Sequence, residues 1–134
     1  MQVGDMIVVD LGSGDHRFVV VGIGSGLQEK VLLVMATSKV EKRRRHAGKG
    51  VLSTQESLVE VQPSEYQSKE NTKHCSLTKL TCFDCNNPSP VPVSYLSGCV
   101  TCDPVSTNLI DKLKQGVRCS PAVDQDTKET FRLQ

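Results

Sequence analysis

Short apolar runs rich in β-branched residues dominate the first third of the chain. The runs cover residues 6–9, 18–21 and 31–34, and glycine-rich stretches at 12–14 and 22–26 separate them. Apolar runs of this length, bounded by turn-forming residues, are typical of strands. The pattern therefore predicts a meander of three closely packed strands within residues 4–38, with the few polar residues at the strand ends.

The pattern after residue 38 is less regular. Residues 50–52, 58–61 and 76–83 indicate further short strands, and Pro63 ends the second of these. Residues 86–92 contain three prolines, which remove backbone donors, so we expect no regular structure there. The tail from Ala122 onward is polar, and we expect it to fray.

One helix is predicted near the end of the chain. Ser106 or Thr107 can cap its start, apolar positions at 109, 110 and 113 form a stripe, and Gly116 follows as a stop signal. The sequence thus predicts a mainly β protein, a β-rich α+β fold, with a short C-terminal helix.

Composition places the chain among single-domain globular proteins. It has 134 residues, of which 37% are hydrophobic and 23% charged. No apolar run approaches the roughly 20 residues that span a bilayer, and the N-terminus lacks the pattern of a secretory signal. We therefore expect a cytoplasmic protein without a membrane partner, in which the six cysteines are mainly reduced thiols or metal ligands.

A dense basic segment follows the predicted meander. Residues 39–49 carry six permanent positive charges and a single acid, Glu41. We expect a solvated loop that contacts an anionic partner or simply keeps the protein soluble. The candidate nucleic-acid-binding residues of this segment are Lys39, Lys42, Arg43, Arg44, Arg45, His46 and Lys49.

The order of motifs in residues 4–10 (GDMIVVD), 17–21 (RFVVV) and 34–38 (VMATS) resembles that of the PemK/MazF-like toxin family. Residues 76–83 and the later helix are similar to its extended, PemK-like branch. The resemblance implies a small SH3-like barrel, a homodimer, and a metal-independent endoribonuclease that cleaves single-stranded RNA and is restrained by an antitoxin. Carried over by position, Arg17 and Thr37 match the pair that handles the scissile phosphate.

The residue types at these positions suit that chemistry. The guanidinium of Arg17 can bind two phosphate oxygens, and the hydroxyls of Thr37 and Ser38 can donate to a third. His16 is a candidate acid or base near neutral pH. The alternative is structural: Arg17 is then a charge at a strand edge, and Thr37 and Ser38 satisfy their own turn.

The cysteines carry a second signal. Cys82 and Cys85 form one C-x-x-C pair, Cys99 and Cys102 form another, and thirteen residues separate the pairs. Four thiolates in two such pairs predict a structural zinc site. Buried, reduced thiols are the alternative.

These observations lead to one leading interpretation and two alternatives. We expect one domain over residues 1–134, with a barrel core at 1–63 and an extension at 64–134 that holds the cysteines and the helix. The leading function is a toxin-type endoribonuclease that requires no cofactor for catalysis. The alternatives are a non-catalytic nucleic-acid-binding module with a structural zinc and a protein-interaction module.

Overall fold

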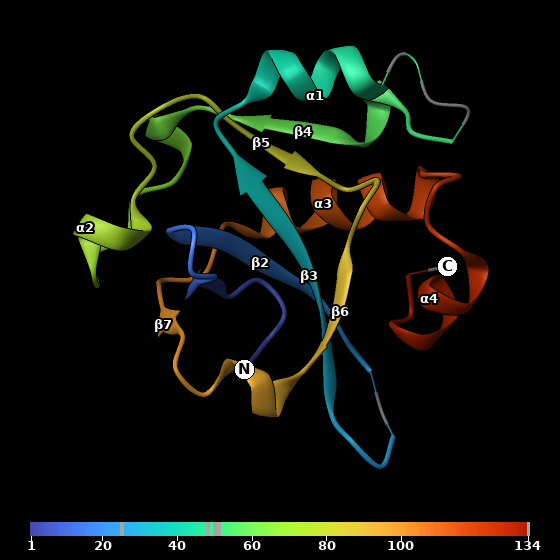
Figure 1. The fold of residues 1–134 in the computed structure, drawn as a ribbon, viewed down its shortest axis with the longest axis horizontal. Helices are drawn as coiled ribbons and strands as arrows, with labels where there is room; N and C mark the ends of the chain where they lie inside the picture. Colours follow the sequence, from blue (N-terminus) through green and yellow to red (C-terminus); the bar gives the residue numbers. More distant parts are fainter. Residues whose placement is uncertain (25, 48, 50–51, 134) are drawn as a thin grey trace.

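The structure, a computed structural model, describes residues 1–24, 26–47, 49 and 52–133, and is built around one antiparallel sheet (Figure 1). Its seven strands are β1 (Met6–Asp10), β2 (Asp15–Gly24), β3 (Lys30–Thr37), β4 (Leu58–Val61), β5 (Thr81–Asp84), β6 (Ser89–Pro92) and β7 (Val100–Thr101). The strand order is β4-β5-β3-β2-β1-β7, and β6 pairs with β3 beside this path. The mainly β class with a short C-terminal helix is therefore confirmed. Over the described residues the sheet is not closed into a barrel.

The three predicted N-terminal strands form the centre of this sheet. β1 pairs with β2 from Met6↔Val19 to Asp10↔Asp15, and β2 pairs with β3 from Arg17↔Ala36 to Gly24↔Lys30. Strands from residues 64–134 join the same sheet, because β5 and β6 both pair with β3 and β7 pairs with β1.

Both faces of the sheet are covered by apolar side chains. On one face, Val19, Val34 and Phe83 pack against the helix α3 (Thr107–Cys119) through Leu113 and Val117. On the other face a smaller cluster contains Ile7, Phe18, Val20, Val31, Leu33 and Leu96. Alternation of side chains along β2 and β3 explains why neighbouring residues enter different clusters.

The predicted C-terminal helix is confirmed at its start and differs at its end. Ser106 caps α3 by accepting a hydrogen bond from the backbone nitrogen of Leu109 at 3.2 Å. Gly116 does not stop the helix, which continues to Cys119. A Cβ at Gly116 would lie 2.9 Å from Cys85 Cβ and Sγ, so this glycine permits close packing instead of termination.

The basic segment is a helix and not the loop expected from its charge. α1 (Val40–Ala47) buries Val40 and Ala47, at its first and last positions, against the rest of the fold. Between them, Arg43 and Arg44 form ion pairs with Asp84 of β5 and Glu60 of β4. These contacts explain why so charged a stretch is helical.

Three other sequence expectations need correction. Residues 89–92 form the strand β6 despite two prolines, because a strand at a sheet edge tolerates residues without a backbone donor. Of the predicted strand at 76–83, only residues 81–83 lie in a strand, and that strand, β5, continues to Asp84. The C-terminal tail does not fray, since α4 (Gln125–Thr130) is followed by the buried Phe131 and Leu133.

Four short elements complete the description, namely η1 (Gln55–Ser57), η2 (Pro63–Glu65), α2 (Thr72–Cys75) and η3 (Val93–Leu96). The predicted strand at 50–52 includes residues 50 and 51, which lie outside the described residues. None of the helices that the structure describes has the length and hydrophobicity needed to span a bilayer.

Candidate functional site

A polar cleft of about 310 Å³ lies where β2 begins and β3 ends. Its third wall is the segment that leads into β5. The residues that line this strand-end cleft are Asp15, His16, Arg17, Ala36, Thr37, Ser38, Lys39, Leu77, Thr78, Lys79 and Thr81. All four candidate catalytic residues and the first residue of the basic segment are therefore brought together.

The strand pairing explains why the cleft opens at this point. Arg17↔Ala36 is the last pair between β2 and β3, while on its other edge the end of β3 pairs with β5 through Ala36↔Phe83 and Thr37↔Cys82. Strand alternation sends the side chains of His16 and Arg17 to opposite faces. Both nevertheless line the cleft, because it lies at the end of the sheet.

Arg17 is half-buried and retains hydrogen-bonding capacity. Its Nη2 donates to the backbone oxygen of Ser76 at 3.5 Å, the long limit of a hydrogen bond. Among the described residues, Arg17 Nε is buried without any partner. A buried donor without an acceptor costs about 1–3 kcal/mol, so this position of Arg17 is held against a cost in free energy.

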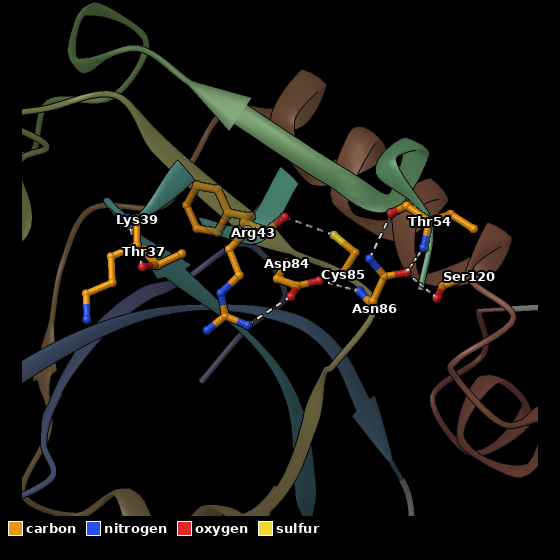
Figure 2. Close-up of polar contacts among 9 residues, drawn as sticks. Thr37, Lys39, Arg43, Thr54, Asp84, Cys85, Asn86 and Ser120 are labelled. Atoms are coloured by element: carbon orange, nitrogen blue, oxygen red, sulfur yellow. Dashed lines mark hydrogen bonds and ion pairs between the residues drawn. The ribbon is translucent and has the colours of Figure 1, made fainter. Parts of the chain in front are cut away.

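Thr37 and Lys39 form the turn that leaves β3. Thr37 Oγ1 accepts a hydrogen bond from the backbone nitrogen of Lys39 at 3.1 Å, as Figure 2 shows. This bond agrees with the structural interpretation, in which Thr37 stabilises its own turn. The hydroxyl hydrogen of Thr37 can still be donated to a ligand. Ser38 and Lys39 are exposed beside it.

Two histidines lie near the start of β2. His16 Nε2 lies 3.2 Å from Ser13 Oγ, and His74 Nδ1 lies 3.2 Å from Asp15 Oδ2. The carboxylate of Asp15, the acidic residue of the cleft lining, is therefore engaged by a side chain from α2. Three cations, Arg17, Lys39 and Lys79, line the same cleft, so its charge favours an anion.

Sequence reasoning missed the wall formed by Leu77, Thr78, Lys79 and Thr81. Nothing local marks Lys79 as a site residue, because its segment has the composition of a strand. It reaches the cleft because β5 pairs with the end of β3, a contact between residues far apart in sequence.

The seven basic-segment residues divide into two groups. Arg43 is ion-paired with Asp84 at 3.1 Å, and Arg44 is ion-paired with both Glu60 and Glu41. Lys39, Lys42, Arg45, His46 and Lys49 are exposed.

A buried hydrogen-bond network supports the residue that anchors Arg43. Asn86 Oδ1 accepts from Thr54 N at 3.0 Å and from Ser120 Oγ at 2.7 Å, and Asn86 Nδ2 donates to Thr54 O at 2.9 Å. The backbone nitrogen of Asn86 in turn donates to Asp84 Oδ1 at 3.0 Å (Figure 2). Arg43 is thus attached to the folded body of the protein and is less able to bind a partner.

The cysteines do not gather as the two C-x-x-C pairs suggest. Cys102 forms a disulfide with Cys75, with a Cα–Cα distance of 5.8 Å, so the expectation of reduced thiols is wrong for these two residues. Cys82 and Cys85 are free and buried, and Cys99 is a half-buried free thiol. Among the described residues, no three His, Cys, Asp or Glu side chains are placed to hold a metal ion.

Burial also sets the chemistry of the thiols of Cys82 and Cys85. Desolvation, reinforced by the nearby carboxylates of Asp84 and Glu60, raises the pKa of Cys82 to about 11. Desolvation raises the pKa of Cys85 further still. Both are therefore protonated and unreactive at neutral pH.

No family model, curated protein or solved structure matches the chain.

Proposed function

We propose that the protein is an endoribonuclease that cleaves single-stranded RNA in the strand-end cleft without a metal cofactor. One observation carries the proposal. Arg17, Thr37 and Lys79, from three separate segments, line one cleft together with His16. This set supplies phosphate-binding groups and a proton-transfer group in one place, which is the minimum that the reaction requires.

The reaction uses the ribose 2′-hydroxyl as nucleophile. Its oxygen attacks the adjacent phosphorus as its proton is removed, and the bond from phosphorus to the 5′ oxygen breaks. The products are a 2′,3′-cyclic phosphate and a strand with a 5′-hydroxyl, so atoms and charge balance once the 5′ oxygen has gained a proton. Negative charge builds up on the phosphate oxygens in the transition state, and preorganised donors accelerate such a step.

Each residue has a defined role in this scheme. Arg17 and Lys79 bind the non-bridging phosphate oxygens, and the Thr37 hydroxyl donates to one of them. The imidazole of His16 accepts the proton of the 2′-hydroxyl, and water protonates the departing oxygen at the open edge of the cleft.

The resemblance to PemK/MazF-like toxins agrees with this proposal. It adds two further predictions, a homodimer and an antitoxin protein that covers the cleft.

The test is cleavage of a labelled, mixed-sequence single-stranded RNA in the presence of EDTA. We expect the wild-type protein to give discrete products, and Arg17→Gln to lower the rate by about 10²–10³, the usual effect of losing one transition-state donor. Arg118→Gln is the matched control, because Arg118 is an exposed arginine on α3, outside the cleft lining. Thermal unfolding of each variant verifies that the fold is retained.

The outcomes separate the candidate functions. Cleavage that is lost in Arg17→Gln and kept in Arg118→Gln supports the proposal. RNA that is bound and left intact by the wild type would favour the non-catalytic binding module. Neither cleavage nor binding would reject nucleic acid as the ligand and favour the protein-interaction module.

A further inference from the structure

The outer surface of α1 carries a row of basic side chains. Lys42, Arg45 and His46 lie on α1, Lys39 immediately precedes the helix and Lys49 follows it, and we call these five residues the basic ridge. Positions 45 and 46 are three and four residues from position 42, so the three side chains lie on one face of the helix. All five are exposed.

The opposite face of α1 is used for folding. Val40 and Ala47 are buried there, and Arg43 and Arg44 are held by carboxylates of the sheet. Within the described residues, none of the ridge side chains forms an ion pair. The helix therefore neutralises two of its arginines internally and presents the remaining cations to solvent.

The ridge is continuous with the strand-end cleft. Lys39 lines the cleft and immediately precedes α1, so the same side chain belongs to both surfaces. From there the ridge runs the length of α1, which is about 12 Å for eight residues at about 1.5 Å per residue. An anionic chain bound at Arg17 can thus continue past Lys39 along a mainly basic surface, on which the exposed Glu41 is paired with Arg44.

We propose that the ridge binds the phosphates of a single strand that extends out of the cleft, so that the preferred substrate is a strand and not a dinucleotide. We expect the ridge to contact mainly the backbone, because four of its five residues are lysines or arginines and none is Phe, Tyr or Trp. It therefore adds affinity and orientation without sequence preference. This inference rests on the proposed function for the identity of the substrate.

The same observations disfavour an anionic membrane as the partner. A helix that lies on a lipid surface inserts an apolar face. The apolar residues of α1 that the structure describes, Val40 and Ala47, are buried in the protein. The ridge has charge without an apolar face beside it, which suits a hydrated polyanion.

The test measures binding separately from cleavage. The probe is a labelled single strand with 2′-deoxy sugars, long enough to cover both cleft and ridge, because such a strand lacks the nucleophile and stays intact. The double variant Lys42→Gln/Arg45→Gln is compared with Lys112→Gln/Arg118→Gln, which removes the same two charge types from exposed positions of α3. Affinity is measured by fluorescence anisotropy over a series of salt concentrations.

We expect the ridge variant to bind the long probe more weakly and with a shallower salt dependence. Each lost phosphate contact lowers the slope of log K against log salt by about 0.7 for a single strand, so two contacts lower it by about 1.4. The α3 variant should match the wild type. In the cleavage assay, the ridge variant should lower kcat/KM for a long RNA and leave a dinucleotide substrate unaffected.

Three results would overturn the inference. One is an unchanged slope in the ridge variant, another is an equal loss in the α3 variant, and the third is binding to anionic vesicles with no binding to the strand. If the wild type cleaves no RNA while the salt slope still depends on the ridge, the ridge inference stands and the proposed cleavage fails. If a long RNA and a dinucleotide are cleaved equally well by the ridge variant and the wild type, the cleavage stands and the ridge inference fails.

Discussion

Arg17 Nη2 donates its hydrogen bond to the backbone oxygen of Ser76, a residue 59 positions further along the chain. This contact joins the start of β2 to the segment that forms the opposite wall of the strand-end cleft. Arg17 therefore connects two walls of the cleft, and we propose that it also binds the anion; the two roles can be separated by substitution.

Arg17→Lys is the variant that separates them. Lysine keeps the positive charge but lacks the planar fork that binds two phosphate oxygens at once. We expect substrate binding to be largely retained while kcat falls by about 10²–10³, as for loss of a transition-state donor. Steady-state kinetics with labelled RNA measure the two effects. Full activity in Arg17→Lys would show that only a point charge is needed.

The disulfide between Cys75 and Cys102 should stabilise the protein and the cleft wall. It closes a loop with a sequence separation of 27, for which chain entropy predicts about 3.5 kcal/mol. Cys75→Ser should lower the free energy of unfolding in urea by about that amount. Cys119→Ser, at an exposed free thiol, is the control and should have no effect. Equal stability of the Cys75→Ser variant and the wild type would argue against the disulfide.

The free thiols should differ sharply in reactivity. Because the pKa of Cys82 is raised to about 11 and the pKa of Cys85 is also raised by burial, both should resist alkylation at pH 8. Cys119 and Cys99, which are more exposed, should react first, and unfolding without reductant should release four thiols in all. Mass spectrometry after timed alkylation gives this order. Stoichiometric zinc with six titratable thiols would instead support the zinc site predicted from the C-x-x-C pairs.

Gly116→Ala should destabilise the protein even though alanine favours helices. The added Cβ would lie 2.9 Å from Cys85 Cβ and Sγ, and Cys85 is itself fully buried and cannot move aside cheaply. Overpacking of this kind typically costs about 1–3 kcal/mol. Gly98→Ala is the control, because nothing lies within 4 Å of a Cβ there. Urea unfolding of both variants tests the expectation, and a Gly116→Ala protein as stable as the wild type would contradict it.

The ion pair between Arg44 and Glu60 should make stability depend on pH in the acid range. The hydrogen bond from Arg44 lowers the pKa of Glu60, so the folded state favours the carboxylate. A lowered folded-state pKa gives stability that is present above the unfolded-state value, about 4.3, and lost as pH falls through the folded-state value. The wild type should therefore exceed Glu60→Gln in stability at pH 7, and the difference should shrink at acid pH. A difference that grows on acidification would contradict this assignment.

Sequence patterns correctly predicted the elements that depend on residues close together in the chain. Residues 6–9, 18–21 and 31–34 alternate with glycine turns, and each lies within a central strand of the sheet. Ser106 likewise marks the start of α3 because a side-chain cap involves only its immediate neighbours. The grouping of Arg17, Thr37 and Ser38 in one cleft followed from their expected positions at adjacent strand ends.

The features that sequence reasoning missed depend on distant contacts. α1 is helical because Asp84 and Glu60 accept its arginines, and neither acid is close to α1 in sequence. Lys79 enters the cleft through the pairing of β5 with β3. The pairing of Cys75 with Cys102 likewise joins two segments, and cysteine spacing alone does not reveal it.

The prolines of β6 have a consequence for how the protein behaves when it is concentrated. Pro90 and Pro92 pair with Leu32 and Lys30 of β3, and neither proline has an amide hydrogen to offer to another strand. A second chain that added a strand beside β6 would meet backbone carbonyl acceptors at these two positions but no backbone N–H donors. This margin of the sheet is thus protected against edge-to-edge aggregation, and replacement of both prolines should make the protein more prone to fibril growth.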